Sequence, residues 1–180
     1  DFSELESGFK PVATYATSKS ADVSIASTSR AKSGKLTAQL NIFGEEHEVK
    51  TQLVGRHNLS ALLAASAVAH QLGIDSVLIA KTLATIGPVK GRMNLLPGLH
   101  ESILIDDTYN AASPVGVFAA LDTLAEMKGH KIAVLGNMNE LGAKSEDAHR
   151  EVGAAAAKIA DLLVVIGPDA EKYLAPAAIE

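Results

Sequence analysis

Three short aliphatic runs that alternate with helical patterns constrain the fold more than any other feature of this sequence. The runs fall at 102–107, 131–135 and 162–166. Helical patterns follow them at 114–127, at 145 to about 160, and from Asp169 onward. Short aliphatic runs of this kind are typical of strands buried on both faces of a sheet. Strands that alternate with helices predict a parallel sheet with right-handed crossovers, so residues 91–180 are predicted to form a Rossmann-like βαβαβ domain of the α/β class.

The first part of the chain has a different pattern. Up to about residue 54, apolar and polar residues alternate, which predicts half-buried antiparallel strands with a hairpin connection at Gly44–Glu46. Two helical patterns follow and predict an αα-hairpin. Asn58 or His57 is placed to cap the first helix, and Asp75 is placed to cap the second. Gly73 is suited to end the first helix.

Prolines and glycines gather around the tripeptide Lys90-Gly91-Arg92. This composition is typical of a linker, so we place a domain boundary near residues 88–98 and divide the chain into 1–90 and 91–180. At 180 residues the chain is long enough for two small domains. Because it begins with Asp1 rather than Met, we expect it to be a piece of a longer protein.

A dense set of polar side chains follows the first aliphatic run. Its members are Asp106, Asp107, Thr108, Tyr109 and Asn110. Ligands of open α/β sheets bind outside the carboxyl ends of strands, so this cluster lies where a site is expected. The alternative is that the two carboxylates only polarise a loop and cap the next helix, which Ser113-Pro114 would begin. Adjacent strand residues point to opposite faces, so Asp106 and Asp107 are a poor chelating pair for a metal.

Two further segments carry side chains suited to a charged ligand or a nucleotide. The loop 136–142 contains Asn137 and Glu140 and precedes a helix N-terminus, where free N–H groups attract anions. Arg92 could bind a phosphate through its planar guanidinium, and a solvated arginine is the alternative. His57-Asn58 could hold a base or a ribose, and an ordinary capped helix is the alternative.

Composition and motif content exclude several function classes. A net charge of -5 provides no basic surface for nucleic acid, and no apolar run reaches membrane-spanning length. Cysteine is absent, which excludes disulfides and thiolate chemistry. No G-x-G-x-x-G follows a strand, and Gly34-Lys35 is followed by Leu36 instead of the Ser or Thr of a Walker A loop. His149-Arg150 is expected on a polar helix face, and the scattered histidines show no zinc spacing.

Five motifs, taken together and in this order, resemble the Mur ligase family. They are Gly55-Arg56-His57-Asn58, Lys90-Gly91-Arg92, Asp106-Asp107-Thr108-Tyr109-Asn110-Ala111, Leu135–Gly142 and His149-Arg150-Glu151-Val152-Gly153. The D-T-Y-N-A and M-x-E-L-G pieces are similar to those of the members that add D-alanyl-D-alanine. The resemblance covers roughly residues 9–170. It implies that 1–90 is the C-terminal part of the central ATP-binding domain and that 91–180 is a truncated C-terminal domain.

The resemblance also implies an activity, which is ATP-dependent amide formation in peptidoglycan synthesis in the cytoplasm. The carboxylate of UDP-N-acetylmuramoyl-tripeptide would be phosphorylated to an acyl phosphate, which the amine of D-Ala-D-Ala would attack, with Mg²⁺ assisting phosphoryl transfer. The family's phosphate-binding loop and Mg²⁺ ligands would lie upstream. We therefore expect the chain to be inactive by itself, to hold no catalytic residue, and to be a monomer without membrane insertion or nucleic-acid partner.

Particular residues are assigned by the same resemblance. The nucleotide contacts are His57, Asn58, Arg92, Asp107, Tyr109 and Asn110. Within this set Asp107 would accept from the ribose hydroxyls and Arg92 would approach the phosphates. Asn137 and Glu140 would face the incoming dipeptide, although Asn137 stands where the family commonly has Asp.

Other interpretations are compatible with the same residues. Another Mur-type ligase, or one similar to folylpolyglutamate synthase, would differ in its amine acceptor. A non-catalytic nucleotide-binding α/β module would lack the upstream phosphate-binding loop. A Rossmann-like domain fused to a small α+β piece without a shared ligand would bind nucleotide independently of Asn58 and Asp107.

Overall fold

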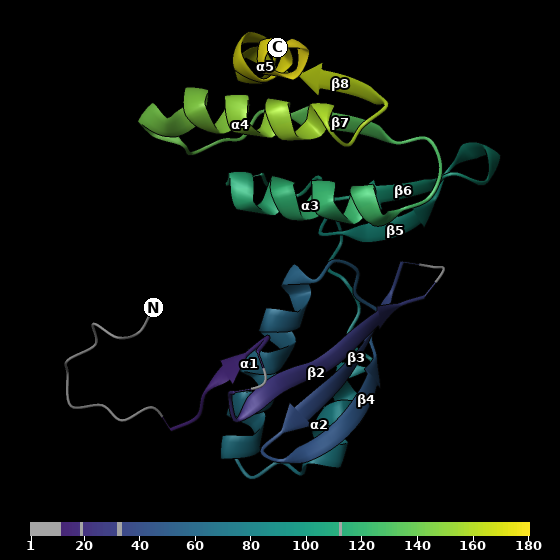
Figure 1. Ribbon diagram of the computed structural model, residues 1–180, viewed down its shortest axis with the longest axis vertical. Coiled ribbons are helices and arrows are strands. Elements are labelled where there is room, and N and C mark those ends of the chain that lie inside the picture. Colours follow the sequence, from purple (N-terminus) through teal and green to yellow (C-terminus); the bar gives the residue numbers. More distant parts are fainter. Residues whose placement is uncertain (1–11, 19, 32–33, 112) are drawn as a thin grey trace. The chain divides into compact units, whose positions relative to one another are not determined.

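The structure is a computed structural model that describes residues 12–18, 20–31, 34–111 and 113–180 (Figure 1). It contains two compact units. The first combines the described residues up to Gln52 with His57–Ile86, and the second combines Leu53–Arg56 with Gly87–Glu180. Each unit has its own strands and helices.

The first unit is built on a four-stranded sheet with the order β1-β2-β3-β4. The strands are β1 (Tyr15–Ala16), β2 (Val23–Arg30), β3 (Leu36–Ile42) and β4 (Glu45–Lys50). The β2-β3 and β3-β4 pairs are antiparallel as predicted, whereas β1 runs parallel to β2. Every second residue of β3 is buried, from Leu36 to Ile42, which confirms the half-buried alternation.

The turn between β3 and β4 differs from the prediction. It consists of Phe43 and Gly44 instead of Gly44–Glu46, because both residues have positive φ (48° and 94°) and close a tight two-residue hairpin. Oδ1 of Asn41 accepts a hydrogen bond from the N–H of Gly44 at 3.0 Å. Strand β4 therefore begins at Glu45, two residues earlier than expected.

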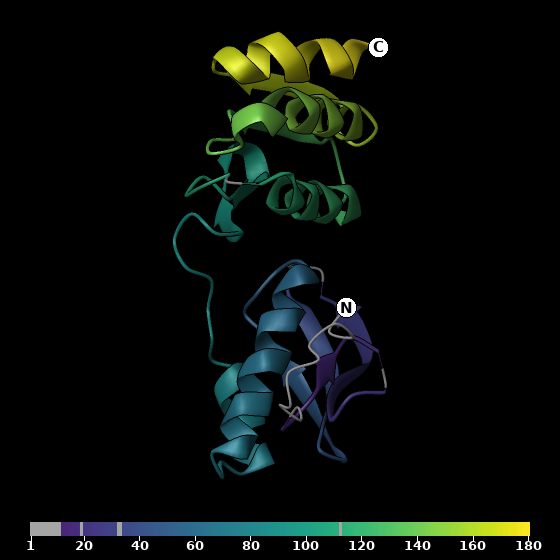
Figure 2. The same cartoon turned by 90° about the vertical axis from the view of Figure 1, so that its left-hand side faces the viewer.

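Two helices, α1 (His57–Gln71) and α2 (Ser76–Leu83), form the predicted αα-hairpin. They cover one face of the sheet of the first unit (Figures 1 and 2). Because α1 begins at His57, both His57 and Asn58 lie in its first turn and neither occupies the predicted cap position. Gly73, two residues after the end of α1, has a φ of +82°, the left-handed conformation with which a glycine ends a helix, as predicted.

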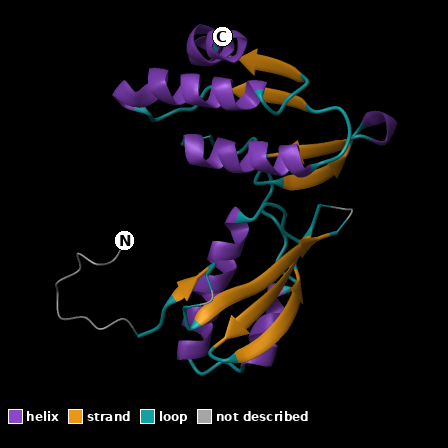
Figure 3. Ribbon diagram, in the orientation of Figure 1, coloured by secondary structure: helices purple, strands orange, loops and turns teal. Residues whose placement is uncertain are grey.

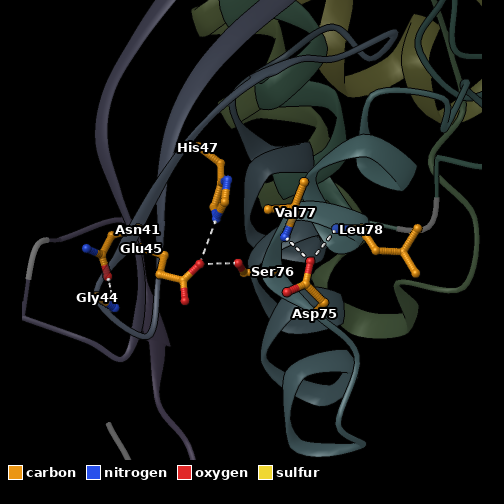
Figure 4. Close-up of polar contacts among 8 residues, drawn as sticks. All are labelled: Asn41, Gly44, Glu45, His47, Asp75, Ser76, Val77 and Leu78. Atoms are coloured by element: carbon orange, nitrogen blue, oxygen red, sulfur yellow. Dashed lines mark hydrogen bonds and ion pairs between the residues drawn. The ribbon is translucent and has the colours of Figure 1, made fainter.

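Polar contacts fix the start of α2 against the β3-β4 hairpin (Figure 4). Oδ1 of Asp75 accepts from the N–H groups of Val77 and Leu78 at 3.0 and 3.3 Å, which confirms the predicted cap. The hydroxyl of Ser76 donates to Oε2 of Glu45 at 2.5 Å. Asp75 therefore caps α2, and Ser76 connects the start of the helix to β4.

The second unit contains two separate pairs of strands. β5 (Asn94–Pro97) pairs with β6 (Ile103–Asp106) in antiparallel fashion, and β7 (Ile132–Gly136) pairs with β8 (Leu162–Ile166) in parallel. The parallel crossover from β7 to β8 was predicted, but the assignment of β6 to the same sheet is wrong. β6 pairs with a strand inside the expected linker, where Pro97 is tolerated because β5 has a neighbour on one side only among the described strands.

The helices of the second unit, purple in Figure 3, begin near the predicted positions. They are α3 (Pro114–Glu126), α4 (Ser145–Ala157), a π-helix (Ala170–Leu174) and α5 (Ala175–Ile179), with short 3₁₀ turns at Leu99–Glu101 and Gly142–Lys144. Ser113 occupies the predicted cap position of α3 and Pro114 is its first residue, but the Ser113 side chain makes no capping hydrogen bond. Within the described part of the chain, no helix combines the length and apolar character needed to span a bilayer.

The strands of the second unit are less buried than their aliphatic sequences predict. Ile103 and Leu104 of β6 are each 54% exposed. In β8, Leu163 and Val165 pack into the core beside residues of α3, α4 and the π-helix, whereas Val164 is 41% exposed. Burial on both faces was therefore a wrong expectation, because in the described residues this core covers one face of the β7-β8 pair.

The cap of α2 leads to a stability prediction. Asp75→Ala should lower the free energy of unfolding of the chain by about 1 kcal/mol, because the first N–H groups of the helix lose their acceptor. Asp75→Asn keeps a side-chain oxygen in the same place and should lose much less. Urea denaturation followed by circular dichroism measures both, and equal losses in the two variants would contradict the capping role.

Candidate functional site

The linker tripeptide folds back onto the turn that follows β6. The N–H of Tyr109 donates to the carbonyl oxygen of Gly91 at 3.0 Å, and Oδ1 of Asp107 accepts from the N–H of Met93 at 3.0 Å. Gly91 has a φ of +71°, and an added Cβ would lie 3.1 Å from the backbone nitrogen of Tyr109. Glycine is therefore the residue that this close approach tolerates without strain. The linker and the turn after β6 form one connected segment.

An exposed cation and an exposed aromatic ring lie together on this segment. The guanidinium carbon of Arg92 is 4.5 Å from the centre of the Tyr109 ring, which is a cation–π contact. Tyr109 is 67% exposed, and Asn110 beside it is exposed as well. A planar cation, an aromatic ring, an amide and the carboxylate of Asp107 thus occur at one turn. This combination suits a ligand that has a base, hydroxyls and phosphates.

The two carboxylates after β6 both bind backbone groups. Oδ1 of Asp106 accepts from the N–H and the hydroxyl of Thr108 at 3.3 and 2.7 Å, which is an Asx-type turn. Asp107 binds Met93, as described above. Both carboxylates thus hold the loop, and neither caps α3, whose cap position is Ser113.

The loop after β7 is held through two consecutive residues. Oδ1 of Asn137 accepts from the N–H of Ala170 at 3.0 Å, and the N–H of Met138 donates to Nε2 of His149 at 3.0 Å. The side chain of Met138 is buried in the core. Glu140 is exposed and has a φ of +66°. The loop is thus fixed at its base and presents the carboxylate of Glu140 to solvent.

The expectation that His149 lies on a polar helix face is wrong. Its side chain is fully buried, whereas Arg150 next to it is exposed. A signal for this burial is present in the sequence, because Ala148, Val152 and Ala156 repeat at a spacing of four and form the buried stripe of α4. His149 borders that stripe, and the polar residues around it in sequence obscure the pattern.

The predicted site residues fall into three groups. One group lies at the linker and the turn after β6: Arg92, Asp107, Tyr109 and Asn110. A second group opens α1 in the other unit: His57, which is exposed, and Asn58, which is half-buried. The third group is Asn137 and Glu140 on the loop after β7. The sequence pattern placed Ser145 and Asp169 only at the starts of helices and did not predict that they hydrogen-bond to each other beside His149.

Comparison with known proteins identifies relatives of this chain. Residues 91–180 match the family of the Mur ligase, glutamate ligase domain. The UDP-N-acetylmuramoyl-tripeptide–D-alanyl-D-alanine ligase of Escherichia coli (strain K12) is 40% identical over 109 residues, which are 61% of this chain and 24% of that protein.

Solved structures agree with this match. MurF from Acinetobacter baumannii has a TM-score of 0.81 and 30% identity, over 93% of this chain and 35% of that one. MurF from Thermotoga maritima in complex with ADP has a TM-score of 0.76 and 27% identity, over 89% of this chain and 37% of that one. The predicted α/β fold class is confirmed. The chain spans between 24% and 37% of the length of these relatives.

The contact between the linker and the turn after β6 leads to a second prediction. Asp107→Ala should lower the free energy of unfolding of the chain by about 1–3 kcal/mol, because the N–H of Met93, a residue that is 4% exposed, loses its acceptor. Asp107→Asn retains Oδ1 and should preserve most of that stability. Amide exchange at Met93 checks the cause: it should accelerate in the alanine variant and stay slow in the asparagine variant.

Proposed function

This chain belongs to the Mur ligase family, and we propose that it is part of an ATP-dependent ligase that adds D-alanyl-D-alanine to UDP-N-acetylmuramoyl-tripeptide in peptidoglycan synthesis. The main support is the 40% identity with a ligase of that name. The chain covers a minor part of that relative, so the activity is proposed for the whole parent protein. In that protein we assign 1–90 to the end of the central ATP-binding domain and 91–180 to the C-terminal domain.

The proposed reaction has two steps. The terminal carboxylate of the tripeptide takes the γ-phosphoryl group of ATP, which leaves as ADP, and becomes an acyl phosphate. The amine of D-Ala-D-Ala attacks the carbonyl carbon, inorganic phosphate leaves, and the nitrogen loses a proton. Division into two steps replaces one difficult displacement by two easier ones.

The residues at the linker and the turn after β6 suit the nucleotide. The cation–π contact of Arg92 with Tyr109, at an exposed site, is worth about 0.5–1 kcal/mol. A hydrogen bond to a charged group contributes about 1.5–3 kcal/mol. Arg92 can therefore leave the ring of Tyr109 for a phosphate at little cost. Asp107 uses Oδ1 for the backbone, so Oδ2 is the oxygen we assign to the ribose hydroxyls.

The remaining contacts are assigned by position. Asn58 and His57 open α1 and would contact the adenine, while Asn110 would line the nucleotide cleft beside Tyr109. Glu140 presents a carboxylate that would attract the ammonium group of the dipeptide. Oδ1 of Asn137 is bound to Ala170, so this side chain would meet the dipeptide through its amide nitrogen.

We propose that the Mg²⁺ of the reaction is not held by the described residues of this chain. Magnesium prefers several oxygen ligands in octahedral geometry, and phosphoryl transfer uses it to neutralise charge. Asp106 and Asp107 each direct Oδ1 to a backbone N–H. Over the described ranges, no group of three His, Cys, Asp or Glu residues could hold a metal ion. Following the family resemblance, we assign the Mg²⁺ ligands and the phosphate-binding loop to the part of the parent protein upstream of this chain.

Phosphate release by the full-length parent protein tests the proposed function. With ATP, Mg²⁺ and UDP-N-acetylmuramoyl-tripeptide, release should depend on added D-Ala-D-Ala. The 180-residue chain should release none under the same conditions. Release with a single amino acid and not with the dipeptide would indicate a different Mur-type ligase. No release with any amine acceptor would favour a nucleotide-binding module. We expect the parent protein to lie in the cytoplasm and to be a monomer, and gel filtration checks the oligomeric state.

A substitution at Glu140 tests the dipeptide assignment. Glu140→Gln in the parent protein should raise KM for D-Ala-D-Ala about ten-fold, equivalent to about 1.4 kcal/mol, because the ammonium group loses its counter-charge. KM for ATP should stay unchanged. Glu151→Gln removes a charge from an exposed residue of α4 and serves as the control. An equal effect of both substitutions would contradict a specific role for Glu140.

A further inference from the structure

His149 is the one fully buried histidine among the described residues, and the proposed reaction does not use it directly. It lies on α4 beside the buried Ala148 and Val152. A buried imidazole is stable when both ring nitrogens have hydrogen-bond partners. The hydrogen-bond partners of its two ring nitrogens therefore indicate the role of His149.

Those partners determine the protonation of the ring. Nδ1 lies 2.7 Å from the carbonyl oxygen of Ser145, which can only accept, so Nδ1 carries the hydrogen. Nε2 lies 3.0 Å from the backbone nitrogen of Met138, which donates, so Nε2 carries none. His149 is therefore the neutral Nδ1–H tautomer. The other tautomer and the doubly protonated ring would each place two N–H groups against one another at Met138.

These contacts belong to a closed ring in which hydrogen bonds alternate with short stretches of backbone. The hydroxyl of Ser145 donates to Oδ2 of Asp169 at 2.6 Å. Asp169 directly precedes Ala170, whose N–H donates to Oδ1 of Asn137 at 3.0 Å. Asn137 in turn precedes Met138, which donates to His149. The loops after β7 and β8 are thus joined to each other and to the first turn of α4.

A close approach at Gly167 supports the same arrangement. Gly167 has a φ of +106°, and an added Cβ would lie 2.6 Å from Oδ1 of Asn137. The side chain of Asn137 therefore packs directly over the backbone at the end of β8. With Asn137 held there and Met138 held by His149, two consecutive residues of the loop have fixed positions.

We propose that His149, as the neutral Nδ1–H tautomer, is a positioning residue that holds the loop 137–141 in the conformation that presents Glu140 to the dipeptide. Glu140 follows Met138 by two residues and adopts a positive φ, so its direction depends on the backbone before it. The link to the dipeptide rests on the proposed function. The hydrogen bond from Met138 to His149 does not depend on it.

Two substitutions of His149 separate positioning from simple packing. The side-chain oxygen of Gln reaches the place of Nε2 and can accept from Met138, whereas Asn reaches only the place of Nδ1. In the full-length parent enzyme, His149→Asn should raise KM for D-Ala-D-Ala about ten-fold with kcat changed less than about two-fold, since the buried N–H of Met138 loses its acceptor. His149→Gln should restore KM to within about two-fold of the unsubstituted enzyme. His130→Asn, at an exposed histidine of the same unit, is the control and should have no effect.

Two measurements on the same protein do not require ligase activity. Nitrogen-15 NMR of labelled histidine should show the Nδ1–H tautomer for His149, and the Nε2–H tautomer would overturn the proposal. Hydrogen exchange of the amide of Met138 should accelerate at least about ten-fold in His149→Asn and stay slow in His149→Gln. Equal exchange in the two variants, or equal KM values, would also overturn it. If the unsubstituted enzyme released no phosphate with the dipeptide, the proposed function would fail, and tautomer and exchange would still decide the role of His149.

Discussion

Polar groups that are buried at the ends of strands must find hydrogen-bond partners inside the protein. The stability of the second unit depends on these hydrogen bonds. The N–H of Met138 has no strand to pair with after β7 ends, and its side chain is buried in the core. The imidazole of His149 provides the acceptor. An unsatisfied buried N–H would cost about 1–3 kcal/mol, a large part of the stability of a small domain.

The turn after β6 meets the same requirement with a carboxylate. Asp107 accepts from the N–H of Met93, and Gly91 lets the linker approach closely enough for Tyr109 to pair with its carbonyl group. The N–H groups of Met93 and Tyr109 and the carbonyl group of Gly91 thereby find partners within the protein. The exposed side chains of Arg92 and Tyr109 remain at its surface, where a ligand can reach them. Residues that hold the loop, such as Asp107, and exposed residues, such as Tyr109, lie within a few positions of each other in this segment.

Much of the fold was predictable because local patterns specify it. The parallel pairing of β7 with β8, the αα-hairpin, the cap at Asp75 and the start of α3 all follow from short-range signals. The grouping of Arg92 with Tyr109 was not predictable from spacing, since it requires the linker to fold back onto a turn more than a dozen residues away. The strand β5 was missed for a related reason: Pro97 marks a linker in the sequence and an edge strand in the structure.

The sequence by itself determined the residue types at each strand end, the periodicity of the helices and the family motifs, because these depend on neighbours along the chain. Only the tertiary structure decided which polar side chains serve the backbone and which face solvent. Asn137 and Glu140 are three residues apart, yet Asn137 binds the N–H of Ala170 and Glu140 is exposed. His149 and Arg150 are adjacent, yet the first is buried and the second is not. Burial depends on partners distant in sequence, such as Met138 for His149, and those partners are set by packing.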